Sequence, residues 1–449
     1  MITTRIRSVE DTLDKIVPLC KKIGITRIAD ITYLDRLYIP NYSVVLPGTE
    51  DKIWVYSGKG PTKKQAKASA LMETIERYSS LASTNSWKFI RGSYDELSRQ
   101  YNGRKMILHP SEVLEPLSFE CRNDMRMDFM FGFDLLANHR ILVPAALALW
   151  RYSRPKDKSA EHKGAIVVNP FAHQHTNGLA SGNVIEEAIC HALCEVIERD
   201  AWSLAELQAS AIPYSILKKI LGMLLENGYR DGLIPYIPTG KFVDDTSIFP
   251  DVDISEVEQS CRPIRDLVGR FAKAHIPLII KDITSDIGIP TFYASSVEWI
   301  THDYGYFVDG IGTHPDSRIA LIRAITEVSQ NRAGNIQGAR DDLRKVEFDQ
   351  NDLDRYRHTW EFTQSKNKIK FSDVKTYVNE DILDDIQVIL DHLKESGFKR
   401  VIIVDLTNPR VGIPVVRAIV PGLETFQITK SLMGRRAFEC FKRSLNRNS

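Results

Sequence analysis

The sequence predicts an α/β fold in which two related halves each contain a strand, a loop of small residues and a helix. The chain has 449 residues, 43% of them hydrophobic, which is enough for a large buried core. Short apolar runs typical of strands alternate with segments of helical periodicity. Residues 66–77 and residues 188–199 are identical at seven of twelve positions, which indicates an internal duplication.

The first half of the chain is predicted to begin and end with a helix. Gly24 stops the first of these helices, and Thr62 is the expected N-cap of the last. The predicted elements are a helix over 9–23, strand and turn over 24–40, a strand over 53–56, a loop over 57–62 and a helix over roughly 63–82.

The second half repeats the order of strand, loop and helix. Its predicted elements are a strand over 166–169, a loop over 177–182 and a helix over about 183–203. Beyond the repeat we expect a strand over 278–282, a helix over about 315–334, a charged, peripheral helical region over 340–396 and a buried strand over 400–405.

Composition and charge argue against several classes of protein. The formal net charge is +1, from 59 basic and 58 acidic residues, which does not suggest a nucleic-acid-binding or membrane-surface protein. No apolar run reaches the length of about 18 residues that a transmembrane helix needs, and the N-terminus does not resemble a secretory signal. The six cysteines form no Cys-x-x-Cys pair, so we expect a reducing cytoplasm. Cys190, His191 and Cys194 lack a second ligand pair at zinc-like spacing, which favours packing over metal binding.

Acidic residues gather on one face of each repeated helix, because positions three, four and seven apart share a helical face. This face holds Ser69, Glu73 and Glu76 in the first helix and Glu187, His191, Glu195 and Glu198 in the second. One such glutamate pair is typical of a solvated helix face. Its recurrence in two helices that are expected to be buried favours a site, since buried carboxylates must protonate or bind cations. All-oxygen ligands favour magnesium, which typically also binds waters and phosphate oxygens.

A third helix supplies a similar face with Arg323, Glu327 and Gln330. Alone, it would be a surface ion pair worth about 0.3–0.5 kcal/mol. Together with Arg77 and Arg199, however, Arg323 offers planar donors for phosphate oxygens. Carboxylates and arginines in this combination predict a magnesium–nucleoside triphosphate site. The sequence contains no P-loop, no Gly-x-Ser-x-Gly elbow and no kinase motif set.

Three parts of the chain, the last of them made of two segments, carry a family resemblance. Residues 57–78, residues 177–200 and the pair of segments 310–314 and 323–332 resemble the signatures of the YcaO family. The resemblance extends over nearly the whole chain. It implies a YcaO-type fold with the two repeated halves around a central ATP–magnesium site. We expect one catalytic unit over 1–449, with an N-terminal segment (1–50), a first repeat (about 51–160), a second repeat (about 161–335) and a C-terminal part (about 336–449).

The resemblance also implies the residues that bind the cofactors, ATP and Mg²⁺. The implied metal ligands are Glu73, Glu76, Glu187, Glu195, Glu198 and Glu327. The implied ATP-binding residues are Arg5, Thr12, Ser69, Arg77, Asn183, Arg199, Arg323 and Gln330. Arg5 stands where the family usually has a lysine. No individual catalytic residue is assigned.

The chemistry implied by the resemblance is activation of a peptide backbone amide. A nucleophile adds to the carbonyl group, the resulting oxyanion takes the γ-phosphoryl group of ATP, and loss of phosphate leaves a C–S or C–N product. The implied magnesium ligands and the arginines fit this chemistry, because stabilisation of charge on the phosphoryl group dominates phosphoryl transfer.

Two absences favour thioamide formation over azoline formation. No proline follows Pro421, whereas azoline-forming members often end in a proline-rich tail, and only 56 residues precede the first signature, too few for a fused leader-binding domain. Thioamide-forming members typically act with a TfuA-type partner and a sulfide source. In methanogenic archaea, their target is a glycine of the methyl-coenzyme M reductase alpha subunit. The resemblance further implies a homodimer.

The residues argue against two other classes of protein. A di-metal carboxylate oxidase also uses glutamate-rich helices, but it expects Glu-x-x-His on two of them, and the third residue after Glu73 and after Glu195 is glutamate. A catalytically inactive scaffold would be expected to have lost some acidic ligands, and all of them are present.

Overall fold

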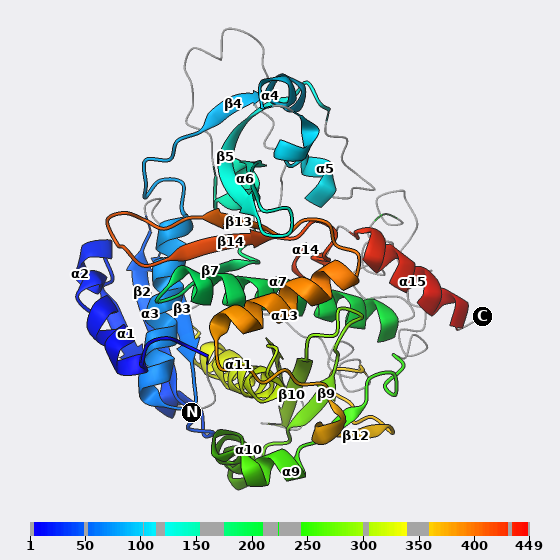
Figure 1. Cartoon of the computed structure of the whole chain (residues 1–449). Coiled ribbons are helices and arrows are strands. Elements are labelled where there is room, and N and C mark those ends of the chain that lie inside the picture. The colour runs from blue at the N-terminus through cyan, green and yellow to red at the C-terminus, as the bar shows by residue number, and fades with distance from the viewer. Residues whose placement is uncertain are drawn as a thin grey trace.

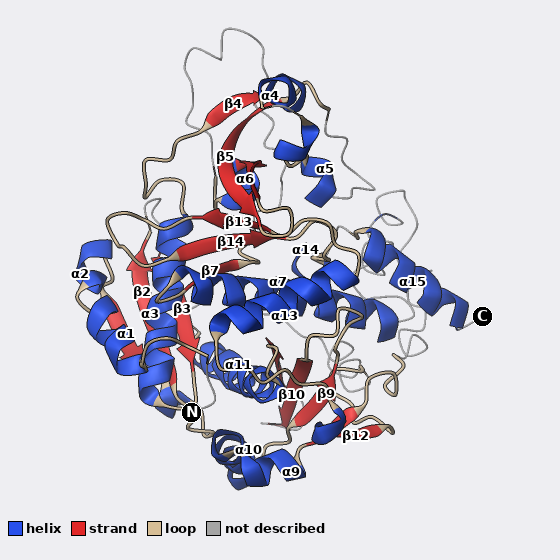
Figure 2. Cartoon of the chain, in the orientation of Figure 1, coloured by secondary structure: helices blue, strands red, loops and turns tan. Residues whose placement is uncertain are grey.

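The computed structural model describes residues 4–48, 53–101, 103–113, 122–152, 175–209, 223, 244–299, 305–338, 359–429 and 433–447 (Figure 1). Helices and strands are mixed throughout this part of the chain, which agrees with the predicted α/β class (Figure 2).

The described strands form three sheets. The first is antiparallel and consists of β1 (Arg27–Asp30), β2 (Asn41–Pro47) and β3 (Ile53–Lys59). The second has the order β11-β10-β9-β8-β12, with β8 at Asp251–Asp253, β9 at Ile279–Asp282, β10 at Thr291–Trp299, β11 at Gly305–Thr313 and β12 at Lys368–Lys370. The third has the order β4-β5-β13-β14-β7, with β6 paired to β5. Its strands are β4 (Ile90–Ser93), β5 (Arg126–Asp134), β6 (His139–Pro144), β7 (Leu179–Ser181), β13 (Ile402–Asp405) and β14 (Val415–Ile419).

Three long helices bring the sheets together. They are α3 (Lys63–Ser80), α7 (Ile185–Ala209) and α11 (Ser317–Gln337). Each packs on the strand that precedes it, α3 on β3, α7 on β7 and α11 on β11. Because α7 also contacts β11 and α11 also contacts β3, the three strand–helix units share one centre.

Glycines allow these helices to lie directly on their strands. A Cβ atom added at Gly58 would lie 2.0 Å from the backbone nitrogen of Ala70, and one at Gly182 would lie 2.5 Å from that of Ala188. One added at Gly310 would lie 2.4 Å from the carbonyl oxygen of Ala324. The strand–helix units of the two repeats are thus joined by a third unit with the same packing, although its sequence lies outside the twelve-residue repeat.

The remaining helices surround this centre. They are α1 (Val9–Ile16), α2 (Leu19–Ile23), α4 (Tyr94–Gln100), α5 (Pro110–Val113), α6 (Ala145–Ala148), α9 (Ser255–Ser260), α10 (Arg262–Ala274), α13 (Ile382–Glu395), α14 (Phe426–Thr429) and α15 (Arg435–Arg447). In Figure 1, β4, β5, α4 and α5 form an upper lobe, and α15 lies at one edge near the C-terminus.

Several predicted boundaries need correction. The helix predicted over 9–23 is divided into α1 and α2, because Pro18 lacks a backbone N–H and its ring does not fit inside a helix. Gly24 ends α2 with a φ of 91°, and the Thr62 side chain caps α3, both as predicted. The predicted loop 177–182 contains β7, because these residues pair with β14.

The region expected to be helical over 340–396 also differs from the prediction. Its described part, residues 359–396, contains β12 and α13, since residues 368–370 pair with β8. Residues 339–358 and the strand predicted over 166–169 lie outside the described residues.

The apolar sides of the repeated helices form the core. Leu71 and Ile75 of α3 are fully buried in one hydrophobic cluster, and Leu193 and Ile197 of α7 are fully buried in another. Burial of these sides leaves the acidic sides of the helices to face the shared centre. Within the part of the chain that the structure describes, every helix is too short or too polar to cross a lipid bilayer.

Candidate active site

A first carboxylate cluster joins the two repeats and consists of Glu73, Glu76 and Glu195. The side chain of Arg77 lies between the two glutamates of α3, with its Nη2 atom 3.7 Å from Glu73 Oε1 and its Nη1 atom 3.6 Å from Glu76 Oε1. Burial raises the pKa of Glu76 well above its ordinary value. Arg77 opposes this shift, whereas Glu195 and Glu73 add to it. Glu76 and Glu195 are therefore electrostatic neighbours, although they belong to different repeats.

A second carboxylate cluster joins α7 to α11 and consists of Glu198 and Glu327. Glu198 Oε2 accepts a hydrogen bond from the backbone N–H of Thr313 at 3.1 Å and lies 3.8 Å from Arg323 Nη2. Glu198 is buried, and this burial raises its pKa to about 7, while Arg199 and Arg323 act in the opposite direction. The two glutamates of the second repeat thus belong to different clusters, Glu195 to the first and Glu198 to the second.

Lys59, at the end of β3, forms an ion pair with Glu327. Burial alone would raise the pKa of Glu327, but the pKa is lowered because Lys59 and Arg199 outweigh burial. The second cluster therefore contains one carboxylate with a raised pKa beside one with a lowered pKa.

The N-terminal segment reaches the start of α7. The Thr12 hydroxyl lies 3.1 Å from Asn183 Oδ1, and Asn183 donates to Glu187 Oε2 from its backbone N–H at 2.9 Å and from its side chain at 3.0 Å. The other oxygen of Glu187 accepts from the backbone N–H of Ile6 at 2.9 Å. Burial lowers the pKa of His191 on α7 well below its ordinary value, and Arg323 and Arg5 act in the same direction. The side chain of Arg5 is itself exposed. Four of the predicted site residues are brought to the N-terminal end of α7 in this way.

Ser69 and Gln330 occupy the remaining predicted positions. Ser69 is half-buried on α3, one turn before Glu73. Gln330 donates from Nε2 to the backbone carbonyl of Ser57 at 2.8 Å, which joins α11 to β3. That both residues bind ATP stays a prediction.

Two charged residues at these clusters were not predicted. Lys59 falls in the predicted loop 57–62, whose glycines carried no assignment. Arg417 lies in β14 and is only 6% exposed, and it is an electrostatic neighbour of Glu195 and Glu76. An arginine within an otherwise apolar, buried strand is unusual, so the sequence pattern marks Arg417 as a candidate site residue.

The donor set fits magnesium. The carboxylates of both clusters are hard oxygen ligands, which Mg²⁺ prefers. Glu76 and Glu198 have raised pKa values because their charge is poorly solvated, so a cation that binds them relieves an unfavourable interaction. Glu73, Glu76 and Glu195 would hold metal on one side of the centre, and Glu198 and Glu327 on the other.

A third group of ligand-type side chains does not fit a metal. Ligand atoms of Cys190, His314 and Asp385 lie within 4.8 Å of one another, and all three residues are buried. However, His314 Nδ1 accepts a hydrogen bond from the backbone N–H of Asp316 at 3.0 Å. The proton of the neutral ring is therefore on Nε2, which then has no lone pair for a metal. The structure thus favours a packed polar cluster at Cys190, His314 and Asp385.

Two carboxylate clusters, each with one buried glutamate and with arginines from several elements beside it, are typical of enzymes with a magnesium–nucleotide site. The chain matches the protein-family model described as YcaO cyclodehydratase, ATP- and Mg²⁺-binding, over residues 57–234 and 246–424. It belongs to the YcaO family. It is accordingly an ATP-dependent enzyme that modifies peptides, with ATP and Mg²⁺ as its cofactors, and the di-metal oxidase interpretation has no support.

Relatives match along most of the chain. A protein of Methanothermobacter thermautotrophicus, described as uncharacterized, is 33% identical over 92% of this chain and 93% of its own. A protein of Rhizobium leguminosarum bv. trifolii, described as lying in the tfuA 3′ region, is 28% identical over 92% of this chain and 87% of its own.

Solved structures share the fold. A heterocyclase in complex with substrate and cofactor superposes with a TM-score of 0.71 at 21% identity, and the match covers 96% of this chain and 54% of the heterocyclase. The structure of YcaO from Methanopyrus kandleri bound with AMPPCP and Mg²⁺ superposes with a TM-score of 0.67 at 21% identity, over 96% of this chain and 95% of that one. The predicted YcaO-type fold is confirmed.

Proposed function

We propose that this enzyme converts a peptide backbone amide into a thioamide at the expense of ATP. The observation that carries the ATP-dependent part is the pair of carboxylate clusters, which three helices and their arginines place at one centre. The observation that favours thioamide formation is the similarity to the relative from the tfuA 3′ region.

The reaction balances as amide, hydrogen sulfide and ATP giving thioamide, ADP and phosphate. The sulfur nucleophile adds to the amide carbon, and the former carbonyl oxygen becomes an oxyanion. This oxygen takes the terminal phosphoryl group of ATP, so that it can leave the carbon as phosphate. The C=S bond then forms, and the proton of the sulfur nucleophile is released.

The residues of the chain hold and orient charged groups in this scheme. Magnesium, when bound, neutralises phosphate charge. The carboxylates of the first and second clusters hold it, and Arg77, Arg199 and Arg323 donate to phosphate oxygens. The contacts of Thr12 with Asn183 and of Ile6 with Glu187 support a role for the N-terminal segment at the site, with Arg5 as a further cation. We assign the ATP-binding and metal-binding roles named in the sequence analysis on this basis.

The proposed substrate is a peptide or protein, with a glycine of the methyl-coenzyme M reductase alpha subunit as the first candidate. A TfuA-type protein is the proposed partner, and a sulfide donor supplies the sulfur. We further propose that the chain acts as one catalytic unit and forms a homodimer. A relative in the tfuA 3′ region supports the choice of partner.

Azoline formation is the second candidate function. The family description as a cyclodehydratase and the structural similarity to a heterocyclase favour it. In this reaction the nucleophile is a Cys, Ser or Thr side chain of the peptide itself, and no external sulfur enters the product.

Mass spectrometry separates the two candidates. The enzyme is incubated with ATP, Mg²⁺, sulfide and a synthetic peptide that contains the candidate glycine, with and without a TfuA-type protein. A mass gain equal to the difference between sulfur and oxygen, together with release of phosphate, supports thioamidation. Loss of one water from a Cys-containing or Ser-containing peptide, with no need for sulfide, supports azoline formation and contradicts the first proposal.

A further inference from the structure

Three buried hydrogen-bond donors at the first carboxylate cluster lack a hydrogen-bond partner among the described residues. They are the hydroxyl of Tyr56, Nε of Arg417 and Nη1 of Arg77, which forms an ion pair with Glu76 Oε1 at 3.6 Å but is too far from it for a hydrogen bond. Buried polar groups are almost always hydrogen-bonded, because an unmade bond costs the desolvation of the group. Three such donors in one place therefore indicate a ligand that accepts hydrogen bonds.

The three donors come from three separate elements, and Arg77 is the one that links the other two. Tyr56 is on β3, Arg77 on α3 and Arg417 on β14. Arg77 is an electrostatic neighbour of both Tyr56 and Arg417. Glu76 is also an electrostatic neighbour of both. In Figure 1, β14 crosses above α7, and β14 contacts both α7 and α3.

Arg417 is held firmly at this position. It pairs in register with Leu179 on one side and Val404 on the other, in a strand whose residues are all buried. Its Nη1 atom donates to the carbonyl oxygen of His175 at 3.1 Å, which fixes one part of the guanidinium group. The Nε atom stays unpaired within the described structure.

The stability of the fold does not explain why an arginine occupies this buried position. Burial lowers the pKa of Arg417 to about 10, and Arg77 acts in the same direction, whereas Glu195 and Glu76 oppose the shift. An apolar side chain at a buried strand position is usually at least as stabilising as a buried ion pair. Two guanidinium groups close together repel each other, and an anion that binds both removes this repulsion.

We propose that Tyr56, Arg77 and Arg417 form the subsite for the terminal phosphate of the nucleotide, beside the magnesium ligands Glu73, Glu76 and Glu195. The ligand is a phosphate because guanidinium groups beside metal-binding carboxylates match a metal-bound phosphoryl group, in which anionic oxygens lie next to the metal. This proposal rests on the proposed function, since it assumes that ATP binds at the shared centre. It adds two residues, Tyr56 and Arg417, to the ATP-binding residues assigned above.

The test compares ATP with ADP. Binding of each nucleotide in Mg²⁺ is measured by titration calorimetry for the unmodified protein, Arg417→Met, Arg417→Lys and Tyr56→Phe. Arg417→Met is expected to weaken ATP binding at least about tenfold, because a hydrogen bond to a charged group is lost, and to leave ADP binding within about twofold. Arg417→Lys should restore part of the ATP affinity, since it keeps the charge and loses the planar donors.

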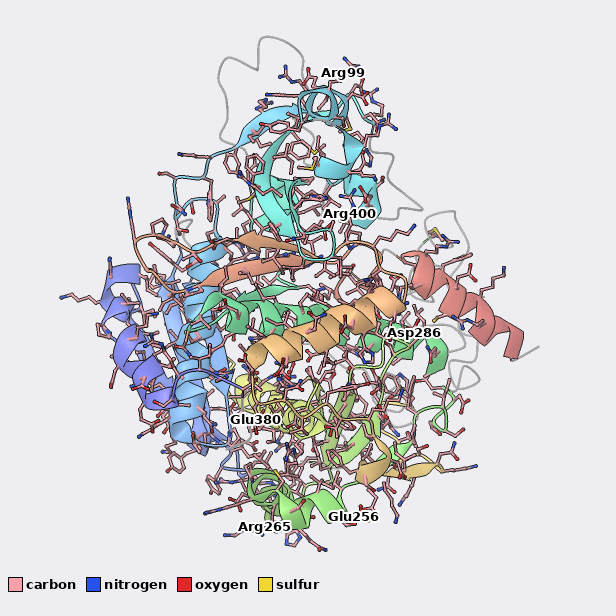
Figure 3. All side chains as sticks on the ribbon, viewed as in Figure 1. Arg99, Glu256, Arg265, Asp286, Glu380 and Arg400 are labelled. Atoms are coloured by element: carbon pink, nitrogen blue, oxygen red, sulfur yellow. The ribbon has the colours of Figure 1, made fainter. Side chains whose placement is uncertain are left out.

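Arg400→Met is the matched control. Arg400 also has a buried nitrogen without a hydrogen-bond partner in the described structure, but it pairs with Glu112 at 3.4 Å, in the upper lobe (Figure 3). Its substitution should change neither affinity. Equal weakening of ATP and ADP by Arg417→Met would overturn the proposal, as would no weakening at all.

Tyr56→Phe keeps the test decisive if Arg417→Met does not fold. It removes one oxygen from a ring that is otherwise unchanged, and it should also weaken ATP more than ADP. Unchanged ATP affinity in Tyr56→Phe would then exclude the subsite. Failure of the unmodified protein to bind either nucleotide would be a different result, because it would contradict the proposed function itself.

Discussion

The ammonium group of Lys59 pairs with the carboxylate of Glu327, so that the end of β3 supplies a counter-charge to the second carboxylate cluster. Both side chains are mostly shielded from solvent, with 21% and 19% of their surfaces exposed. In the absence of a metal ion, Lys59 is therefore one of the cations that offset the negative charge at Glu327, together with Arg199 and Arg323.

Removal of this ammonium group should make the protein depend more on magnesium. Lys59→Met is expected to lower the free energy of unfolding by about 1–3 kcal/mol without metal, because a charged hydrogen bond is lost. Added Mg²⁺ should then raise the melting temperature more than in the unmodified protein, since the ion replaces the missing charge. Thermal denaturation with and without MgCl₂ measures both effects.

The control for this substitution is Lys63→Met. Lys63 pairs with Asp30 at 2.8 Å on the protein surface, away from the clusters. It should leave the response to Mg²⁺ unchanged. If Lys59→Met and the unmodified protein respond equally to Mg²⁺, Lys59 does not serve as a counter-charge at the metal site.

The close contact between β3 and α3 predicts a strong effect at Gly58. Because a Cβ atom at Gly58 would lie 2.0 Å from the Ala70 backbone nitrogen, Gly58→Ala must push the helix away from the strand. We expect a loss of about 3 kcal/mol or more in the free energy of unfolding, measured by chemical denaturation. Gly269→Ala, in α10 with open space around it, should instead gain up to about 1 kcal/mol. Similar stability changes at the two positions would contradict the close packing.

A buried glutamate outside the site predicts part of the pH dependence of stability. Glu424 accepts hydrogen bonds from the backbone N–H groups of Gly434 and Ala437, yet burial raises its pKa to about 7 from an ordinary value of 4.5. Between these pH values, the folded protein keeps a proton that the unfolded chain has released. The contribution of Glu424 to stability is thus fully present below about pH 4.5 and is lost as the pH rises through about 7.

Glu424→Gln should flatten this dependence, because an amide resembles the protonated carboxyl group and does not titrate. Chemical denaturation between about pH 4.5 and pH 8 should show a shallower fall of stability than in the unmodified protein. Glu439→Gln, at an exposed position of α15, is the matched control and should keep the original profile. An unchanged profile in Glu424→Gln would show that the group is ionised in the folded state throughout this range.

Local periodicity explains how the sequence predicts which candidate site residues share a helix face. The glutamates of α3 and α7 lie three residues apart, and helical geometry alone places such residues on one face. The packing partners of those faces depend on which strands pair, and strand register is set by contacts between distant segments. Arg417 reaches the first cluster because β14 pairs with β7, a relationship that nothing in the sequence around residue 417 specifies.

The fold, too, was predictable only where the local sequence specifies the structure. The two repeated helices were predicted from the residues that they share, whereas the strand that packs on α7 is β7, in a segment that was predicted to be a loop. The β11–α11 unit has the same glycine-mediated packing without the shared residues. The packing needs only a small residue on the strand at the crossing point, so sequence identity is not required. The break at Pro18 is a local effect that the sequence does contain, because a proline inside a predicted helix marks its boundary.

Magnesium-dependent ATP binding by Glu76→Gln and Glu198→Gln tests the central claim most directly. These variants each remove one negative charge from one carboxylate cluster, and Glu256→Gln is the control at the surface of α9 (Figure 3). Titration calorimetry with ATP and MgCl₂ should show binding weakened at least about tenfold in both cluster variants and unchanged binding in the control. ATP binding as tight in both cluster variants as in the unmodified protein would contradict the assignment of this centre as the ATP–magnesium site.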